Sequence, residues 1–242
     1  MTAYLEIALA ALIAGTLDTV AGFGGGLLLL PILVLTAGSR DAVLLSAIIP
    51  LGWNIVRIIM LRTWIRPRAV ALFALGIVPG AIAGAFLFVD IDPDLLRRAI
   101  GIILVVFGAY YIVRLYFDLP AAPKISEWWF PFIGLASGIV GSVLGAGHGP
   151  MQSAGLTSAA FAARDVAATN GALGGLTAVA RLAGYAAAGS LHESLWIPGL
   201  IGVVAGAIGA VIGIRISRKS KDTTLELVIG GAMVLAGIRM IL

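Results

Sequence analysis

Three charged side chains stand inside long apolar stretches of the chain and are its best candidates for chemistry: Asp18, Arg57 and Arg181. An ionised side chain deep in a membrane-spanning helix costs about 3 kcal/mol, so such a residue usually faces a cavity and has a function. A planar guanidinium matches the geometry of an oxyanion. Two simpler interpretations remain open: Asp18 satisfies free amides at a helix end, and the arginines extend to the membrane surface.

The two arginines each end a polar face, because the same spacings of seven and four residues precede both. The faces consist of Ser46, Trp53 and Arg57 in one stretch and Asn170, Thr177 and Arg181 in the other. Asn54 lies beside the first face. Residues at these spacings share one side of a helix. We therefore predict that both faces contribute to binding a small anion.

Two glycine-rich tracts interrupt apolar stretches and predict broken helices. The first contains Gly22, Gly24, Gly25 and Gly26, and the second contains Gly145, Gly147, His148 and Gly149. Each glycine lowers helix propensity by about 1 kcal/mol relative to alanine. The short apolar segments 27–37 and 150–161 that follow expose free amides at their N-termini, which attract anions. We therefore predict that these glycines and His148 bind the substrate.

Proton coupling through Asp18 or His148 is a hypothesis, because a histidine titrates near neutral pH. For His148 a purely structural, hydrogen-bonded role is the alternative. The glycine tracts open no βαβ unit and no P-loop lysine follows them, so they do not predict a nucleotide site.

The composition is that of an integral membrane protein. Of the 242 residues, 60% are hydrophobic and 12% are charged, and mean hydropathy is +1.08. Soluble domains carry about 25% charged residues. Cysteine is absent, which excludes disulfides and thiolate sites. We expect no cofactor, no metal site and no nucleic-acid partner; the expected partners are a small anion and the lipid bilayer.

The apolar segments form two similar halves. They cover residues 4–21, 27–37, 42–61, 69–89, 95–117, 128–145, 150–161, 166–189, 194–214 and 223–242. Matched features differ in number by 123 to 129 residues; they include Gly22 with Gly145, Arg40-Asp41 with Arg164-Asp165, Arg57 with Arg181, and Gly80 and Gly84 with Gly209 and Gly213. We predict a first repeat at 1–117, a cytoplasmic linker at 118–127 and a second repeat at 128–242. The glycine pairs four residues apart predict close helix packing.

Loop charge predicts that the two halves are inverted. The basic loop of the first half is 62–68, and its next loop, 90–94, is acidic; in the second half the order is reversed, with the basic loop at 215–221. Basic loops favour the cytoplasmic side. This places both termini outside the inner (plasma) membrane.

The first glycine tract with its preceding helix, Ala14 to Gly26 followed by Pro31, resembles the first-repeat signature of the TauE/SafE sulfite exporter family. The tract from Ser137 to Gly149 resembles the second signature, and the likeness in length, repeat and hydropathy covers essentially the whole chain. Phe23 and His148 depart from the small residues usual in these loops. The resemblance implies a secondary transporter for sulfite, sulfoacetate or another organosulfonate.

The sequence therefore predicts an all-α membrane protein of two inverted repeats, each with a glycine-broken helix pair and three spanning helices. We expect it to transport, and to export, a small sulfur-containing anion by rocking of one repeat against the other. The alternative is a passive anion channel with the same site. An intramembrane enzyme is disfavoured because the chain has two histidines and one deep carboxylate, and a sulfur relay because it has no cysteine.

Overall fold

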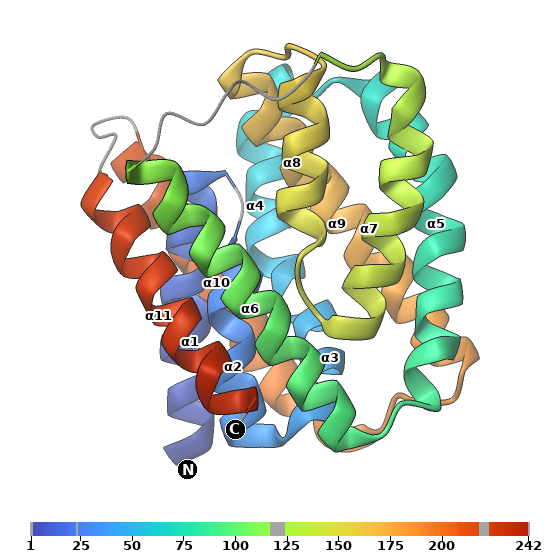
Figure 1. The fold of residues 1–242 in the computed structure, drawn as a ribbon, viewed down its shortest axis with the longest axis vertical. Helices are drawn as coiled ribbons and strands as arrows, with labels where there is room; N and C mark the ends of the chain where they lie inside the picture. Colours follow the sequence, from blue (N-terminus) through green and yellow to red (C-terminus); the bar gives the residue numbers. More distant parts are fainter. Residues whose placement is uncertain (1, 23, 117–123, 218–222, 242) are drawn as a thin grey trace.

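The computed structural model describes residues 2–22, 24–116, 124–217 and 223–241, and every regular element within them is helical (Figure 1). The helices of the first half are α1 (Thr2–Ala21), α2 (Gly25–Ala37), α3 (Ser39–Ile48), α4 (Pro50–Leu61), α5 (Pro67–Val89) and α6 (Pro93–Tyr116). Those of the second half are α7 (Phe130–Leu144), α8 (His148–Ser158), α9 (Ala163–Ala187), α10 (Trp196–Ser217) and α11 (Thr223–Ile241). Short 3-10 turns at Arg62–Trp64, Glu127–Trp129 and Glu193–Leu195 lead into α5, α7 and α10.

Several helices have the length and composition of membrane spans. In the described residues five stretches qualify: Thr2–Ala21, Ser39–Trp64, Pro67–Val89, Glu127–Leu144 and Glu193–Ile216. Helix α2 is apolar but has only 13 residues, about 20 Å at 1.5 Å per residue. It therefore falls short of the roughly 30 Å hydrocarbon core, as predicted for a segment after a glycine break.

The predicted single segment 42–61 consists of two helices. Helix α3 ends at Ile48 and α4 begins at Pro50, with Ile49 between them in helical geometry. Proline has no N–H, so the helical hydrogen bonding is interrupted there. The counterpart in the second half, α9, has no proline and runs unbroken for 25 residues. Most of the predicted linker 118–127 lies outside the described residues, as do Arg218, Lys219 and Lys221 of the basic loop.

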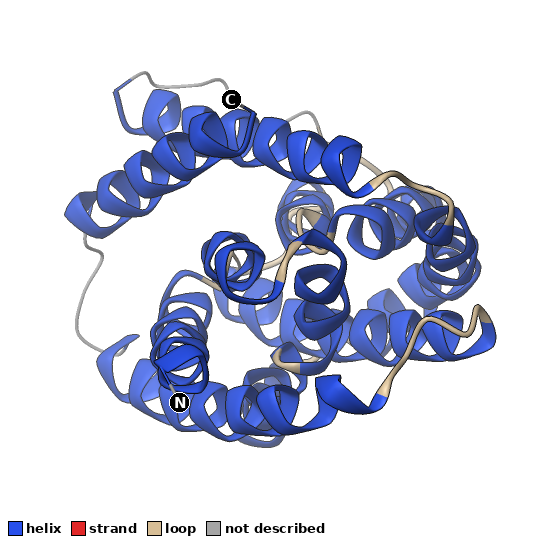
Figure 2. Ribbon diagram, turned by 90° about the horizontal axis from the view of Figure 1, so that it is seen from below, coloured by secondary structure: helices blue, strands red, loops and turns tan. Residues whose placement is uncertain are grey.

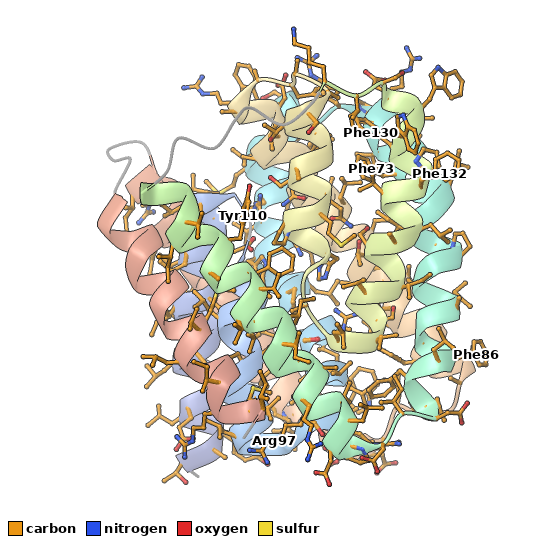
Figure 3. All side chains as sticks on the ribbon, viewed as in Figure 1. Phe73, Phe86, Arg97, Tyr110, Phe130 and Phe132 are labelled. Atoms are coloured by element: carbon orange, nitrogen blue, oxygen red, sulfur yellow. The ribbon has the colours of Figure 1, made fainter. Side chains whose placement is uncertain are left out.

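The helices leading into the two glycine tracts run in opposite directions. Helix α1 starts at the lower end of the bundle, where the N-terminus is marked (Figure 1). Helix α7 starts at Phe130 at the upper end (Figure 3). There the Phe130 ring stacks on Phe73 of α5, with ring centroids 4.4 Å apart.

Two helix pairs pack backbone against backbone. On α5, a Cβ added at Gly80 would lie 2.3 Å from the carbonyl oxygen of Leu135 on α7; on α10, a Cβ at Gly209 would lie 2.1 Å from that of Leu12 on α1. Gly84 and Gly213 approach α7 and α1 in the same way, one turn further along. The predicted close packing at these glycines is therefore confirmed.

A third pair joins the last helices of the two halves, α6 and α11, along one side of the bundle (Figure 2). Gly101 of α6 and Gly237 of α11 each approach the other's backbone carbonyl, at 2.7 and 2.6 Å from the position of an added Cβ.

Two carboxylate contacts connect the halves at opposite ends of the bundle. Asp165, in the first turn of α9, accepts hydrogen bonds from the Nε and Nη2 atoms of Arg66, just before α5. Asp41, in the first turn of α3, lies 3.1 Å from Nε2 of His192, in the turn before α10. The Asp165 side chain is 5% exposed, whereas Asp41 and His192 are 36% and 44% exposed.

The difference in burial predicts unequal contributions to stability. Asp165→Asn is expected to lower the free energy of unfolding by about 1–2 kcal/mol, because it weakens charge-assisted hydrogen bonds to a buried acceptor. The matched variant Asp41→Asn is expected to cost less than about 1 kcal/mol, because exposed pairs contribute little. Thermal unfolding of both variants in detergent measures the difference. Equal midpoints for the two variants would contradict this prediction.

Candidate functional site

Each glycine tract contains two glycines in the left-handed region of backbone space. Gly22 and Gly24 have φ of 87° and 99°, and the equivalent Gly145 and Gly147 have φ of 78° and 91°. A side chain at such a φ costs about 1–2 kcal/mol, so glycine is the residue that turns the chain here without strain. The two tracts therefore share the conformation that ends one helix and starts the next.

The two breaks meet at one cavity in the interior of the bundle. Its volume is about 40 Å³, enough for a few water molecules or a small anion. It is lined by Asp18, Gly24, Gly26, Leu27, Ser46, Pro50, Trp53, Asn54, Arg57, Gly145, Ala146, Gly147, His148, Gly149, Pro150, Asn170 and Gly174. Its walls therefore come from α1, α3, α4 and α9, and from the two breaks with the first turns of α2 and α8.

An ion pair between α1 and α4 forms part of the wall. The Nη1 atom of Arg57 donates to Oδ2 of Asp18, and both side chains are buried. The other carboxylate oxygen, Oδ1, accepts from the backbone N–H of Gly25 at 2.8 Å, in the first turn of α2. Asp18 therefore does cap the broken helix, and it also neutralises the arginine. The pair of Asp18 with Arg57 was not predicted from the sequence. The only indication of it was that the apolar stretches contain one acid and few bases.

Arg57 also connects the first break to the second half. Its Nη2 atom donates to the carbonyl oxygens of Gly22 and of Ala167 on α9, at 2.9 and 2.6 Å. Asn170 of α9 donates to the same Gly22 carbonyl at 2.9 Å. The carbonyl freed by the helix break is thus satisfied from two helices, which fixes the position of the break.

Two glycines of α9 leave space for the polar side chains of α4, and the sequence did not predict this role for them. A Cβ at Gly171 of α9 would lie 3.1 Å from Nε of Arg57, and one at Gly174 would lie 2.9 Å from the Asn54 amide. These glycines show no periodic signal that separates them from the other glycines of the chain.

Arg181 lies behind the cavity wall. It donates to the carbonyl oxygens of Val43 and Ser46, to the Ser46 hydroxyl and to the Tyr185 hydroxyl. The Tyr185 hydroxyl in turn donates to the carbonyl of Ser142 on α7. Arg181 thus contacts the site through Ser46, which lines the cavity.

The structure brings most of the predicted binding residues to one place. Those that line the cavity are Gly24, Gly26, Ser46, Asn54, Arg57, Gly145, Gly147, His148, Gly149 and Asn170, together with Asp18. Four others do not line it: Gly22, Gly25, Thr177 and Arg181. Gly22 and Gly25 bond to Arg57 and Asp18, while Thr177 accepts from Gln152 at 3.0 Å, deeper in the second half.

Some polar groups at the cavity have unused hydrogen-bonding capacity. Asn54 is buried, and its side chain makes no hydrogen bond to another described residue. Nδ1 of His148 and Oδ1 of Asn170 are buried without partners in the described part of the chain. Burying such groups is costly unless a ligand or water pairs with them, so the cavity is suited to a polar occupant.

Comparison with known families decides the class of the protein. The family model described as "Sulfite exporter TauE/SafE" matches residues 7–240. The chain belongs to the TauE/SafE family. The matched region includes both glycine breaks and every residue of the cavity wall. Comparisons with curated proteins and with solved structures gave no match. As a TauE/SafE member, the chain is a multi-pass membrane protein of a family of transporters for sulfur-containing anions.

Proposed function

We propose that the protein is a secondary transporter that exports a small sulfur-containing anion, such as sulfite or an organosulfonate, and binds it in the cavity between the two glycine breaks. The observation that carries the proposal is this cavity, which both breaks line together with a buried arginine. A volume of about 40 Å³ favours a small inorganic anion or the head of a sulfonate over a larger solute.

The electrostatics of the cavity favour an anion. Helices α2 and α8 begin at the breaks, so the positive ends of their dipoles lie at the cavity wall. Arg57 adds a guanidinium, whose charge the Asp18 carboxylate balances in the empty site. The Asn54 amide adds donors that no described side chain uses. Backbone and amide donors of this kind bind oxyanions, because each oxygen accepts several hydrogen bonds.

Reciprocal contacts support a relation between inverted halves. Arg57 donates to the carbonyl of Ala167, and Arg181 donates to that of Val43. Arg57 follows Val43 by 14 positions, and Arg181 follows Ala167 by 14 positions. Each arginine therefore bonds to the residue of the other half that corresponds to the acceptor in its own half. Inverted repeats with binding at the midplane are the usual architecture for alternating access. We therefore propose alternating access as the mechanism of transport. We also propose that both termini lie outside the membrane.

Uphill transport distinguishes this function from a passive channel with the same site. In proteoliposomes with an imposed pH gradient, we expect labelled sulfite to accumulate against its own gradient, whereas protein-free liposomes show only leakage. Thermal shift with sulfite, thiosulfate, methanesulfonate, acetate and chloride gives the order of affinities, because a ligand stabilises the state that it binds. Sulfite flux that only equalises the two sides would support the channel and contradict the transporter.

A further inference from the structure

We propose that Asp18 couples anion binding to the uptake of one proton: the anion takes the place of the Asp18 carboxylate at Arg57, and Asp18 becomes protonated. This inference rests on the proposed function and specifies the coupling ion and its site. It begins from the ion pair in the cavity wall, where the Asp18 and Arg57 side chains are buried and both residues line the cavity.

The Nη1 atom is the part of the Arg57 guanidinium that can change its partner. Nη2 is occupied by two backbone carbonyls, of Gly22 and Ala167, which the chain geometry holds in place. Nε is buried without a partner among the described residues and faces α9 at Gly171, away from the bond to Asp18. Nη1 bonds to a single side-chain oxygen, Oδ2 of Asp18. An anion that reaches Nη1 from the cavity competes with this oxygen for the same guanidinium nitrogen.

Two negative charges at one buried guanidinium are unfavourable. Like charges a few ångströms apart in a low-dielectric site disfavour the second ionisation. Binding of an anion beside Asp18 therefore favours the protonated carboxyl. The proton comes from the bulk aqueous phase and forms the O–H bond at Oδ2, while Oδ1 continues to accept from the Gly25 amide. The first turn of α2 thus keeps its cap in both states.

Charge balance gives the stoichiometry. In the empty site, the Asp18 carboxylate and the Arg57 guanidinium sum to zero. In the loaded site, neutral Asp18, positive Arg57 and a monovalent anion also sum to zero. A neutral site avoids the large penalty of an uncompensated buried charge when the protein changes conformation. One proton therefore crosses with each monovalent anion.

The surroundings of Asp18 contain few other titratable groups. From α4 the only one is Arg57, and α2 has none. From α10, the charged residue is Arg215, exposed in the last turn. His148 of α8 lines the same cavity, and its ring fills the space where a side chain at Gly141 would lie. Gly141 is the counterpart of Asp18 in the second half, so the site has one coupling carboxyl rather than two.

Infrared difference spectroscopy of the reconstituted protein tests the proposal directly. Addition of sulfite to the wild type is expected to produce the carbonyl band of a protonated carboxylic acid. The band is expected to disappear in Asp18→Asn and to persist in Asp165→Asn, which alters a buried carboxylate, paired with the exposed Arg66, away from the cavity. Sulfite binding without the band, or a band that persists in Asp18→Asn, would overturn the coupling and leave the transporter function standing.

Flux measurements provide a second test. Asp18→Asn is expected to reduce the accumulation driven by a pH gradient more strongly than it reduces exchange of labelled for unlabelled sulfite. Accumulation equal to that of the wild type would overturn the proposal. If the variant does not fold, the presence or absence of the protonated carboxyl band in the wild-type spectrum tests the proposal by itself. Absence of sulfite binding by the wild type would contradict the proposed function itself.

Discussion

Arg57→Gln is expected to abolish measurable sulfite binding and to lower the thermal stability of the purified protein. The substitution removes the positive charge at the cavity and the bonds to the Gly22 and Ala167 carbonyls. It also leaves the Asp18 carboxylate buried without its partner, and breaking one side of a buried ion pair costs about 3–5 kcal/mol. Sulfite-dependent thermal shift and thermal unfolding of the free protein measure the two effects.

Two further variants separate binding from folding. Arg97→Gln is the matched control, because Arg97 is exposed on α6 and donates only to the carbonyl of Arg239 (Figure 3). It is expected to change neither measurement. The double variant Asp18→Asn/Arg57→Gln is expected to regain part of the lost stability, since no buried charge remains, but not binding. Normal sulfite affinity in Arg57→Gln would exclude Arg57 from the site.

The second large effect is expected at the α1–α10 contact. Gly209→Ala places a methyl group 2.1 Å from the Leu12 carbonyl oxygen, closer than any real contact, so the two backbones have to separate. The three atoms nearest to this methyl group all belong to the backbone of α1, so no flexible side chain can move aside. We expect little or no monodisperse protein after detergent extraction.

The control variant is expected to have the opposite effect on stability. Gly231 lies inside α11, and a Cβ there would meet nothing within 4 Å. Gly231→Ala is therefore expected to stabilise the protein by about 1 kcal/mol, because alanine is the better helix former. Size-exclusion profiles and thermal midpoints of the two variants provide the comparison. A well-folded Gly209→Ala protein would show that the α1–α10 contact tolerates separation.

Local patterns predicted much of the architecture. Hydropathy indicated the membrane class, and the glycine tracts located both breaks, because the signals for these features lie within a few residues of each other. The small-residue spacing at Gly80 and Gly209 identified the tight helix contacts for the same reason. Pro50 was a local signal as well, but its break between α3 and α4 was not predicted.

The candidate site was predicted only in part, because its interactions join residues far apart in the chain. The pair of Asp18 with Arg57 depends on how α1 and α4 are placed relative to each other, which no periodicity within either helix specifies. The position of Arg181 behind Ser46 has the same origin. Matching spacings suggested equal roles for the two arginines, but at the cavity Arg57 has a carboxylate partner and Arg181 bonds to carbonyls and hydroxyls.

The glycine contacts between α5 and α7 and between α1 and α10 have a mechanical consequence. Each pair joins a helix of the first half to one of the second. At the glycines the two backbones are in direct contact, with no side chain between them that could change conformation as the helices slide. We therefore expect each pair to translate as a solid unit during any conformational change. Each of these two units would then contain one helix from the first half of the sequence and one from the second.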